Sequence, residues 1–409
     1  MKIGILTYHA VCNFGANLQV LSTVGFLRNE GHNPIVINWM TEELDAQYKC
    51  STPQIQYNEH VNFRKAYLPM TKRCYSEKDI AEVIQDEGIE AIIVGSDAVA
   101  QHHPFLSRIV FPCRRIFCIE QVSSDRLCPN PFWGSFAKYL TKKIPMAMMS
   151  VSSQNSSYKL LTQSDKRILQ EHINLFDFVS TRDTWTSNMF KYVTQGKVHP
   201  KVTPDPVFAF NYNFLEVPTM EQIRRKYSLS KPYCLVSFLN SSQVSFDWLT
   251  EFKKMMQNDG IECVAFPFPY GITFHHPFDK EINVPLSPID WYALIKYSSS
   301  YVGNNMHPIV VSLHNAVPCF SFDTYGVKTL RLFVNEKSSK IYHIMDKFNV
   351  LSNRSQVGSR FKRNPTPNVV VKQLKSFDKA SVQLIANSYY QEYEQMMHII
   401  LNRLSHGKK

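Results

Sequence analysis

The sequence alternates between short apolar segments and amphipathic segments, and this alternation restricts the fold more than any other feature. Residues 2–7 predict a buried strand, residues 8–17 a loop, and the following segment a helix that ends near Asn29. Gly31 can close that helix, because glycine adopts the left-handed cap at little cost, and residues 34–38 predict the next strand. Strand, helix and parallel strand form a βαβ unit, which is typical of doubly wound α/β sheets.

The alternation continues through both halves of the chain. With 409 residues the chain is too long for one ordinary hydrophobic core, so two domains are expected. We predict a Rossmann-like domain over residues 1–210, with loop insertions at 40–75 and 100–140, and a second one over residues 220–376. Residues 377–409 predict a long amphipathic helix and a tail, which pack back across the two domains. The predicted fold class is α/β, with two Rossmann-like domains that face one cleft.

Composition and charge restrict the function classes. A hydrophobic content of 44% indicates a folded protein, and no apolar run approaches the roughly 20 residues that cross a bilayer. The first residues are too strand-like for a secretory signal, so we expect a cytoplasmic protein. Nine scattered cysteines without paired C-x-x-C spacing predict free thiols and no metal site. The formal charge of +11 favours an anionic partner, but no nucleic-acid-binding motif accompanies it, so we expect no nucleic acid partner.

Polar residues follow several of the predicted strands. Ser96 and Asp97 directly follow one strand, and Ser153 follows the next. Ligands of open α/β sheets lie at the carboxyl ends of strands, which makes these residues candidates for a site. Ordinary turn chemistry explains them as well, because serine and aspartate are common in turns. Arg182 ends a further strand beside an aspartate, and it predicts either a structural ion pair or a clamp for carboxylate or phosphate.

A second candidate site lies at residues 301–322, which predict a strand end, a turn, a short helix and another strand. Pro308 favours the first position of that helix, because its missing N–H would have no partner there. Proline disfavours the helical conformation for the residue before it, so His307 is expected just outside the helix start. Free N–H groups and the helix dipole favour an anion at such a start. The alternative is a buried turn in which the histidine has its hydrogen-bond partners within the protein.

Short motifs occur in a fixed order along residues 1–347. They are Asn13-Phe14-Gly15-Ala16-Asn17-Leu18-Gln19, Val94-Gly95-Ser96-Asp97, Ser180-Thr181-Arg182-Asp183, Asp205-Pro206, Asn305-Met306-His307-Pro308 and Ser339-Lys340-Ile341. In this order they resemble the motifs of the polysaccharide pyruvyl transferase family. That family carries an Asn-Tyr-Gly-Ala-x-Leu-Gln-like turn, Val-Gly-Ser-Asp and Ser-x-Arg-Asp strand ends, an Asp-Pro pair, a histidine turn and a Ser-Arg-Ile helix start. Each motif alone is weak, whereas the ordered set is specific.

The resemblance implies a GT-B-like fold and an enzyme that transfers pyruvate from phosphoenolpyruvate, without a cofactor, to a sugar of a surface or extracellular polysaccharide precursor as a cyclic ketal. It implies as partners phosphoenolpyruvate and a glycan or lipid-linked oligosaccharide acceptor, with peripheral contact to the cytoplasmic face of the inner membrane. His307 would act as acid and base or bind phosphate, and Arg182 would bind an anion. The other expected substrate-binding residues are Asn13, Gly15, Ser96, Asp97, Ser153, Asn305, Lys328, Arg331, Ser339 and Lys340.

The chain departs from the family pattern at three positions. Asn305 stands where many members have an arginine, so the site lacks a charged guanidinium that could bind an anion through two hydrogen bonds. Pro308 and Gln154 each replace a glycine. These changes fit an altered donor or acceptor, an arginine supplied from elsewhere, or a loss of activity.

Two other functions stay open. A GT-B glycosyltransferase that uses a nucleotide sugar needs an acidic residue for the ribose, and Glu281 and Asp290 are the nearby candidates. A catalytically inactive partner in glycan assembly is the other alternative. The aromatic segment with Phe132, Trp133 and Phe136 fits an acceptor groove, contact with a membrane surface, or ordinary packing.

Overall fold

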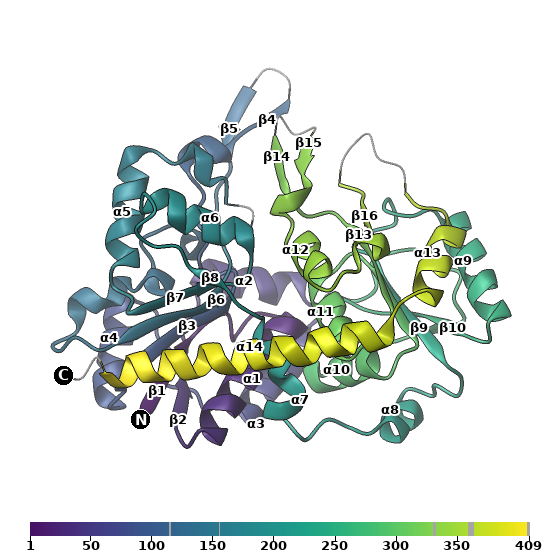
Figure 1. Ribbon diagram of the computed structural model, residues 1–409, viewed down its shortest axis with the longest axis horizontal. Helices are drawn as coiled ribbons and strands as arrows, with labels where there is room; N and C mark the ends of the chain where they lie inside the picture. Colours follow the sequence, from purple (N-terminus) through teal and green to yellow (C-terminus); the bar gives the residue numbers. More distant parts are fainter. Residues whose placement is uncertain (114–115, 155, 330–332, 359–363, 407–409) are drawn as a thin grey trace.

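Two parallel β-sheets form the framework of the protein (Figure 1). The computed structural model describes residues 1–113, 116–154, 156–329, 333–358 and 364–406. Within these ranges the first sheet has the order β2-β1-β3-β6-β7-β8, with the bounds Asn33–Val36, Lys2–Leu6, Ala91–Asp97, Met146–Val151, Phe178–Thr181 and Lys201–Val202. The second sheet has the order β11-β10-β9-β12-β13-β16, with the bounds Lys280–Glu281, Glu262–Ala265, Tyr233–Ser237, Ser300–Gly303, Cys319–Asp323 and Arg354–Gln356. These sheets confirm the predicted α/β class.

The strands of the first sheet are apolar because both faces of the sheet are covered. Ile5 of β1 lies beside Val36 of β2 and Ile93 of β3 in parallel register, and all three side chains are buried. A strand buried on both faces reads as a continuous apolar run, which is the pattern that the sequence shows.

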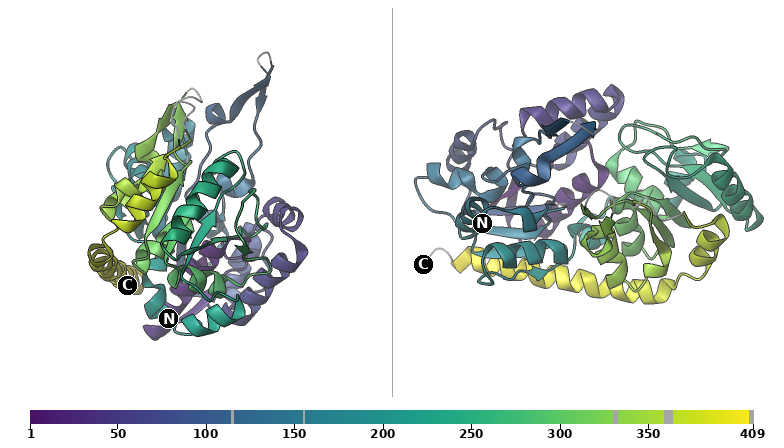
Figure 2. Two further views of the ribbon diagram at one scale, coloured as in Figure 1. Left: turned by 90° about the vertical axis from the view of Figure 1, so that its right-hand side faces the viewer. Right: turned by 90° about the horizontal axis from the view of Figure 1, so that it is seen from above.

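Helices pack against both sheets (Figures 1 and 2). The first half contains α1 (Phe14–Asn29), α2 (Glu42–Ser51), α3 (Gln54–Tyr67), α4 (Glu77–Asp86), α5 (Gln163–Ile173) and α6 (Thr184–Val193). The connection and the second half contain α7 (Phe210–Asn213), α8 (Met220–Lys226), α9 (Phe246–Asn258), α10 (Pro288–Lys296), α11 (Met306–His314), α12 (Lys340–Lys347) and α13 (Pro367–Lys375). α1 begins earlier than predicted, because the side chain of Asn13 accepts the N–H of Ala16 at 3.2 Å and caps the helix at Phe14.

The predicted loop at residues 40–75 is wrong, because α2 and α3 occupy most of it. The buried side of α3 consists of Gln56, His60 and Phe63, and Leu44 is the buried residue of α2. Neither helix therefore carries the apolar stripe by which an amphipathic helix is recognised in a sequence.

Residues 100–140 are largely irregular, as predicted. A hairpin of β4 (Ile109–Cys113) and β5 (Ile116–Ile119) projects from this segment, and β14 (Val327–Thr329) and β15 (Phe333–Asn335) form another hairpin in the second half (Figure 1). The aromatic side chains of Phe132, Trp133 and Phe136 are at most 1% exposed and belong to the core under the first sheet. Ordinary packing is therefore their role.

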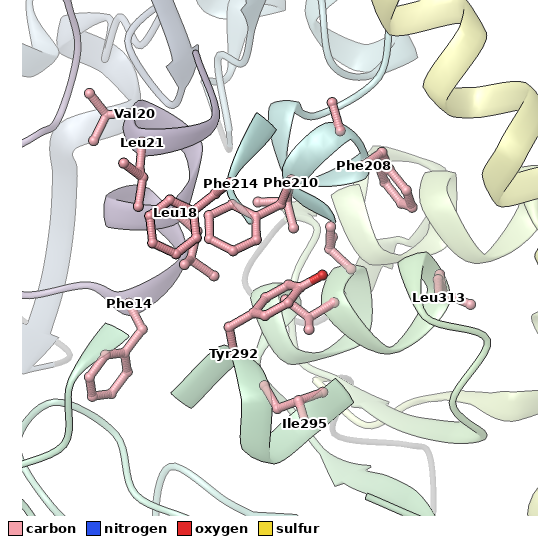
Figure 3. Close-up of a cluster of buried hydrophobic side chains, with 14 of the residues drawn as sticks. Phe14, Leu18, Val20, Leu21, Phe208, Phe210, Phe214, Tyr292, Ile295 and Leu313 are labelled. Carbon is pink, nitrogen blue, oxygen red and sulfur yellow. The ribbon is translucent and has the colours of Figure 1, made fainter. Parts of the chain in front are cut away.

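The two halves share one continuous apolar core (Figure 3). Phe14 of α1 stacks on Trp291 of α10 with ring centroids 5.3 Å apart, and Phe210 of α7 contacts Tyr292 of α10 at 4.5 Å. Close-packed side chains of this kind resist small displacements. The position of one sheet relative to the other is thus fixed by buried contacts beneath the cleft.

The helix α14 (Lys379–His406) runs along both halves (Figures 1 and 2). Its 28 residues give a length of about 42 Å at 1.5 Å per residue. Near its end, the Met396 sulfur accepts hydrogen bonds at 3.3 Å from the hydroxyls of Ser150 and Ser180 at the first sheet. Among the described residues, no helix combines the length and the apolar character that a membrane span requires.

Candidate active site

The carboxyl ends of both sheets face each other across a cleft at the two points where the strand order reverses. In the first sheet the reversal lies between β1 and β3, and in the second between β9 and β12. Ligands of doubly wound folds bind at such switch points. Two cavities lie in this cleft, a smaller one of about 190 Å³ and a larger one of about 360 Å³. Both are lined by Asn13, Tyr48, Asn305, His307 and Tyr325.

His307 lies where the two cavities meet. It is the second residue of α11, not the residue before the helix as predicted, because Asn305 is the N-cap and Pro308 is the third helical residue. The first-turn N–H groups of a helix have no intrahelical partner, so proline is accommodated there without losing a bond. The imidazole is 5% exposed, and its Nε2 has no hydrogen-bond partner within the described ranges.

Gly15 makes room for the His307 ring. A Cβ atom added to Gly15 would lie 2.0 Å from Cγ of His307 and 2.4 Å from its Nδ1. No side chain fits at that distance, so the glycine in the first turn of α1 and the histidine in the first turn of α11 are matched across the cleft. Burial lowers the pKa of His307 to about 4, even though the negative charge of Asp97 opposes the shift. The imidazole is therefore neutral at pH 7.

Two cationic side chains line the smaller cavity. Lys340 is the first residue of α12, and its Nζ lies 4.9 Å from the ring centroid of Tyr325. Burial, together with the charge of Arg182, lowers the pKa of Lys340 to about 8. Arg126 lies in the irregular segment of the first half, and its Nε has no hydrogen-bond partner. In the part of the chain that the structure describes, neither Lys340 nor Arg126 forms an ion pair.

Arg182 is held between two carboxylates. Its Nη1 lies 2.9 Å from Oδ2 of Asp205, and its Nη2 lies 3.4 Å from Oδ1 of Asp97. Burial alone would raise the pKa of Asp97, but the charge of Arg182, together with other nearby positive groups and a hydrogen bond from the Ala98 N–H, lowers it. Arg182 lines neither of the two cavities, so the structural ion pair describes its observed contacts. A role of Arg182 in anion binding stays a prediction.

Three predicted site serines lie behind the cleft, where they hydrogen-bond to the protein and line neither cavity. The hydroxyl of Ser96 donates to the carbonyl of Ser150 at 2.9 Å, and that of Ser153 lies 3.0 Å from the Thr186 hydroxyl. Ser339 caps α12 and donates to Asp323 at 2.6 Å. These hydroxyls support the elements that carry the site.

The remaining predicted residues divide by position. Asn13, Asp97, Asn305 and Lys340 line the smaller cavity, and Gly15 lines the larger one. Lys328 belongs to β14, where only its backbone is described, and Arg331 lies outside the described residues.

Several residues that line the smaller cavity are not predicted by the sequence. Tyr8 and Tyr325 each follow a strand by two residues, so the carboxyl-end rule could have found them. Tyr48 and Arg126 come from segments without periodic signal. The Tyr8 hydroxyl donates to Asp125, and burial raises the pKa of Tyr8 well above its usual value.

Gln154 also lines the smaller cavity, in a backbone conformation that explains one departure from the family pattern. Its φ is 50°, in the left-handed region that glycine adopts most readily. A glycine at this position, as in the family pattern, would adopt the same backbone conformation readily. Among the described residues, no group of three or more His, Cys, Asp or Glu side chains could hold a metal ion.

The acidic residues considered for a nucleotide-sugar site lie outside both cavities. Asp290 accepts a hydrogen bond at 2.7 Å from the Tyr227 hydroxyl and pairs with Lys226. Glu281 pairs with His276 at 3.4 Å. These contacts give the two carboxylates structural partners away from the cleft.

Comparison by sequence identifies one family. The family model described as polysaccharide pyruvyl transferase matches residues 13–325. No curated protein matches the chain by sequence.

Comparison with solved structures identifies the fold. A UDP-GlcNAc 2-epimerase from Neisseria meningitidis, solved with UDP-GlcNAc bound, superposes with a TM-score of 0.53 at 11% identity, over 98% of this chain and 100% of that one. The UDP-N-acetylglucosamine 2-epimerase from Rickettsia bellii gives 0.53 at 10% identity, over 99% and 97%. The UDP-GlcNAc 2-epimerase from Methanocaldococcus jannaschii gives 0.51 at 11%, over 95% and 99%. The shared feature is the GT-B arrangement of two Rossmann-like units.

Proposed function

The chain belongs to the polysaccharide pyruvyl transferase family, and we propose that it transfers pyruvate from phosphoenolpyruvate to a sugar of a surface polysaccharide precursor as a cyclic ketal. The smaller cavity supports phosphoenolpyruvate as the donor. This compact molecule carries a phosphate and a carboxylate, and a site for it needs cations that are not already neutralised. Lys340 and Arg126 meet that need, since neither forms an ion pair with a described residue. These two cations, which form no ion pair with the described residues although Asp97 and Asp125 also line the cavity, carry the proposal.

The start of α11 offers further donors to an anion in the smaller cavity. Its first turn lines the cavity, and Asn305 makes no side-chain cap to α11, whereas Ser339 caps α12. Free N–H groups at such positions favour anionic ligands. Arg126 also brings a guanidinium to the cavity that Asn305 lines, and we propose that it replaces the arginine that many family members carry at that position.

His307 is the residue to which we assign proton transfer. The methylene carbon of phosphoenolpyruvate takes a proton, and a sugar hydroxyl bonds to the neighbouring carbon as its own proton leaves. The bond to phosphate then breaks with its electron pair on the phosphate, and a second hydroxyl closes the ketal and gives its proton to the phosphate. A histidine at the junction of two cavities can serve both substrates.

At pH 6 we expect donor binding to take up more protons in the native protein than in His307→Gln, because the donor phosphate, with a second pKa of about 6, titrates in both. The pKa of His307 is about 4, so the imidazole is neutral, and the negative charge of the donor raises that pKa. Lys340, with a pKa of about 8, is already charged and contributes nothing to the uptake. Calorimetry of phosphoenolpyruvate binding in two buffers of different ionisation enthalpy measures the uptake. Uptake by His307→Gln equal to that of the native protein would contradict the assignment.

Turnover tests the proposed function itself. Incubation with phosphoenolpyruvate and a panel of oligosaccharide acceptors is expected to release phosphate and to give a product with the methyl signal of a pyruvate ketal. UDP-glucose in place of phosphoenolpyruvate is the control. Tight binding of UDP with no binding of phosphoenolpyruvate would favour a glycosyltransferase. Absence of turnover together with no thermal shift by either ligand would favour an inactive partner in glycan assembly.

We further propose that the acceptor is a glycan or a lipid-linked oligosaccharide and that the reaction occurs on the cytoplasmic side of the inner membrane. The formal charge of +11 supports this proposal, because anionic headgroups attract a basic protein surface.

A further inference from the structure

We infer that the larger cavity binds an uncharged pyranose unit of the acceptor, next to the donor in the smaller cavity. The inference rests on the proposed function, because it assigns the second substrate of the same site. The cavity volume of about 360 Å³ falls within the range of small-molecule pockets, which is about 300–1,000 Å³. Its walls come from both halves of the protein, with α1 and α2 on one side and the loop after β10 on the other.

The polar groups of the larger cavity are uncharged at pH 7. The described residues that line it include no Asp, Glu, Lys or Arg, and the one titratable imidazole, His307, is neutral. Amides and hydroxyls take the place of charges, from Asn13, Gln47, Asn304 and Asn305 and from Ser51 and Thr52. Amides both donate and accept hydrogen bonds, and sugar hydroxyls do the same. A diphosphate or a uronate would find no cation in this cavity.

Aromatic rings supply the apolar surface of the larger cavity. Phe14 and Trp291 stack with their planes 20° apart, and Phe268 and Tyr270 stack within 5° of parallel, with centroids 5.3 Å apart. Stacked rings are rigid faces that lose little conformational freedom when a ligand binds. The C–H faces of a pyranose ring can pack on such surfaces while its hydroxyls bind the amides.

An unsatisfied buried amide points to a ligand. Asn304 is fully buried and lines the larger cavity. Its Nδ2 donates to Oε1 of Gln243, whereas its Oδ1 has no hydrogen-bond partner in the described chain. A buried acceptor without a partner is unfavourable, so it is expected to gain one in the working state. A sugar hydroxyl provides that donor.

The two cavities place the proposed substrates on either side of His307. Asn13, Asn305 and His307 line both, so a pyranose in the larger cavity has its nearest hydroxyls at the wall of the smaller one. This arrangement suits attack by two neighbouring hydroxyls on a single donor carbon, because both substrates are held beside the same imidazole.

Saturation-transfer NMR with monosaccharide probes tests the inference. The probes are the methyl glycosides of glucose, galactose, mannose and N-acetylglucosamine, with methyl glucuronide and UDP as charged competitors. At least one neutral glycoside is expected to bind. Tyr270→Ala should weaken that binding about tenfold, because it removes one aromatic face. Tyr75→Ala is the matched control, since Tyr75 is 64% exposed and lines neither cavity, and it should leave binding unchanged.

The outcomes separate this inference from the proposed function. Calorimetry with phosphoenolpyruvate, on the same samples, reports the donor site alone. Binding of a neutral glycoside that depends on Tyr270, with no binding of phosphoenolpyruvate, would uphold the sugar site and overturn the donor assignment. Binding of phosphoenolpyruvate with no glycoside signal at the highest soluble concentrations would uphold the donor assignment and overturn the sugar site. Preference for UDP or the glucuronide, lost in Tyr270→Ala, would overturn the assignment of an uncharged sugar.

Discussion

Replacement of Gly15 by alanine is expected to reduce kcat at least about 100-fold while the protein stays folded. The new Cβ would lie 2.0 Å from Cγ of His307, the ring atom bonded to the side-chain Cβ, so rotation of the ring about the Cβ–Cγ bond cannot relieve the overlap. The imidazole must move by roughly 1 Å or more, and a displacement of that size in an active site can cost about 100-fold in rate. Phosphate release measures the rate, and circular dichroism checks the fold.

A double-mutant cycle separates the clash from other effects. In the native background, overpacking by Gly15→Ala should lower the free energy of unfolding by about 1–3 kcal/mol. In the His307→Ala background the clash is absent, and the better helix propensity of alanine should instead raise stability by about 0.5–1 kcal/mol. Gly25→Ala on the same helix is the control, because its Cβ would meet the carbonyl of Asn213 at 2.1 Å. That variant should be destabilised equally in both backgrounds. An equal loss for Gly15→Ala would contradict the pairing.

Lys340→Met is expected to weaken phosphoenolpyruvate binding by about 10–100-fold and, at the same time, to raise the melting temperature. Loss of a hydrogen bond to a charged group accounts for the weaker binding, at about 1.5–3 kcal/mol. The gain in stability follows from the lowered pKa of about 8, compared with 10.5 for an unperturbed lysine. The folded state binds the proton less tightly than the unfolded chain, so native stability should increase as the pH rises from about 8 to 10.5.

The pH dependence provides the internal check. Because methionine carries no charge, Lys340→Met should melt higher than the native protein at pH 7, and the difference should shrink at pH 10. Lys347→Met on the same helix is the control, since Lys347 pairs with Glu392 at 3.2 Å on the surface. It should change neither binding nor stability by more than about 0.5 kcal/mol. Native-like affinity of Lys340→Met for phosphoenolpyruvate would show that the donor lies elsewhere.

The predictable part of the fold is the part with a repeating apolar pattern. The strands β1, β3 and β6 are buried on both faces, and their continuous apolar runs identify them. The helix α3 was missed because its buried side includes Gln56 and His60. The Gln56 amide exchanges hydrogen bonds of 2.9 and 2.6 Å with the backbone of Leu286 in the second half, and the His60 ring lies 2.8 Å from the Asn17 side chain. Polar groups satisfied by tertiary contacts look like surface residues in a sequence.

The candidate site was predictable in its backbone positions and less so in its charges. Residues that follow strands or begin helices, such as Asn13, Asn305 and Lys340, line the cleft, and their role in substrate binding stays a prediction. Arg126 could not be found, because it reaches the cavity from an irregular segment whose path depends on the whole fold. For Arg182 the position at a strand end is predictable from the sequence. Its ion pairs with Asp97 and Asp205 are not, because they depend on contacts between distant segments.

The apolar core that joins the two halves also bears on how the protein would choose its acceptor (Figure 3). Many enzymes gain selectivity by closing around the correct substrate, so that a wrong one fails to assemble the active centre. With Phe14, Trp291, Phe210 and Tyr292 packed beneath the cleft, the walls are already assembled before any substrate arrives. Discrimination between sugars must then depend on the fit to preformed walls, where one misplaced hydroxyl leaves a buried amide unpaired. Acceptor preference should therefore change through single substitutions on those walls and without altered domain motion.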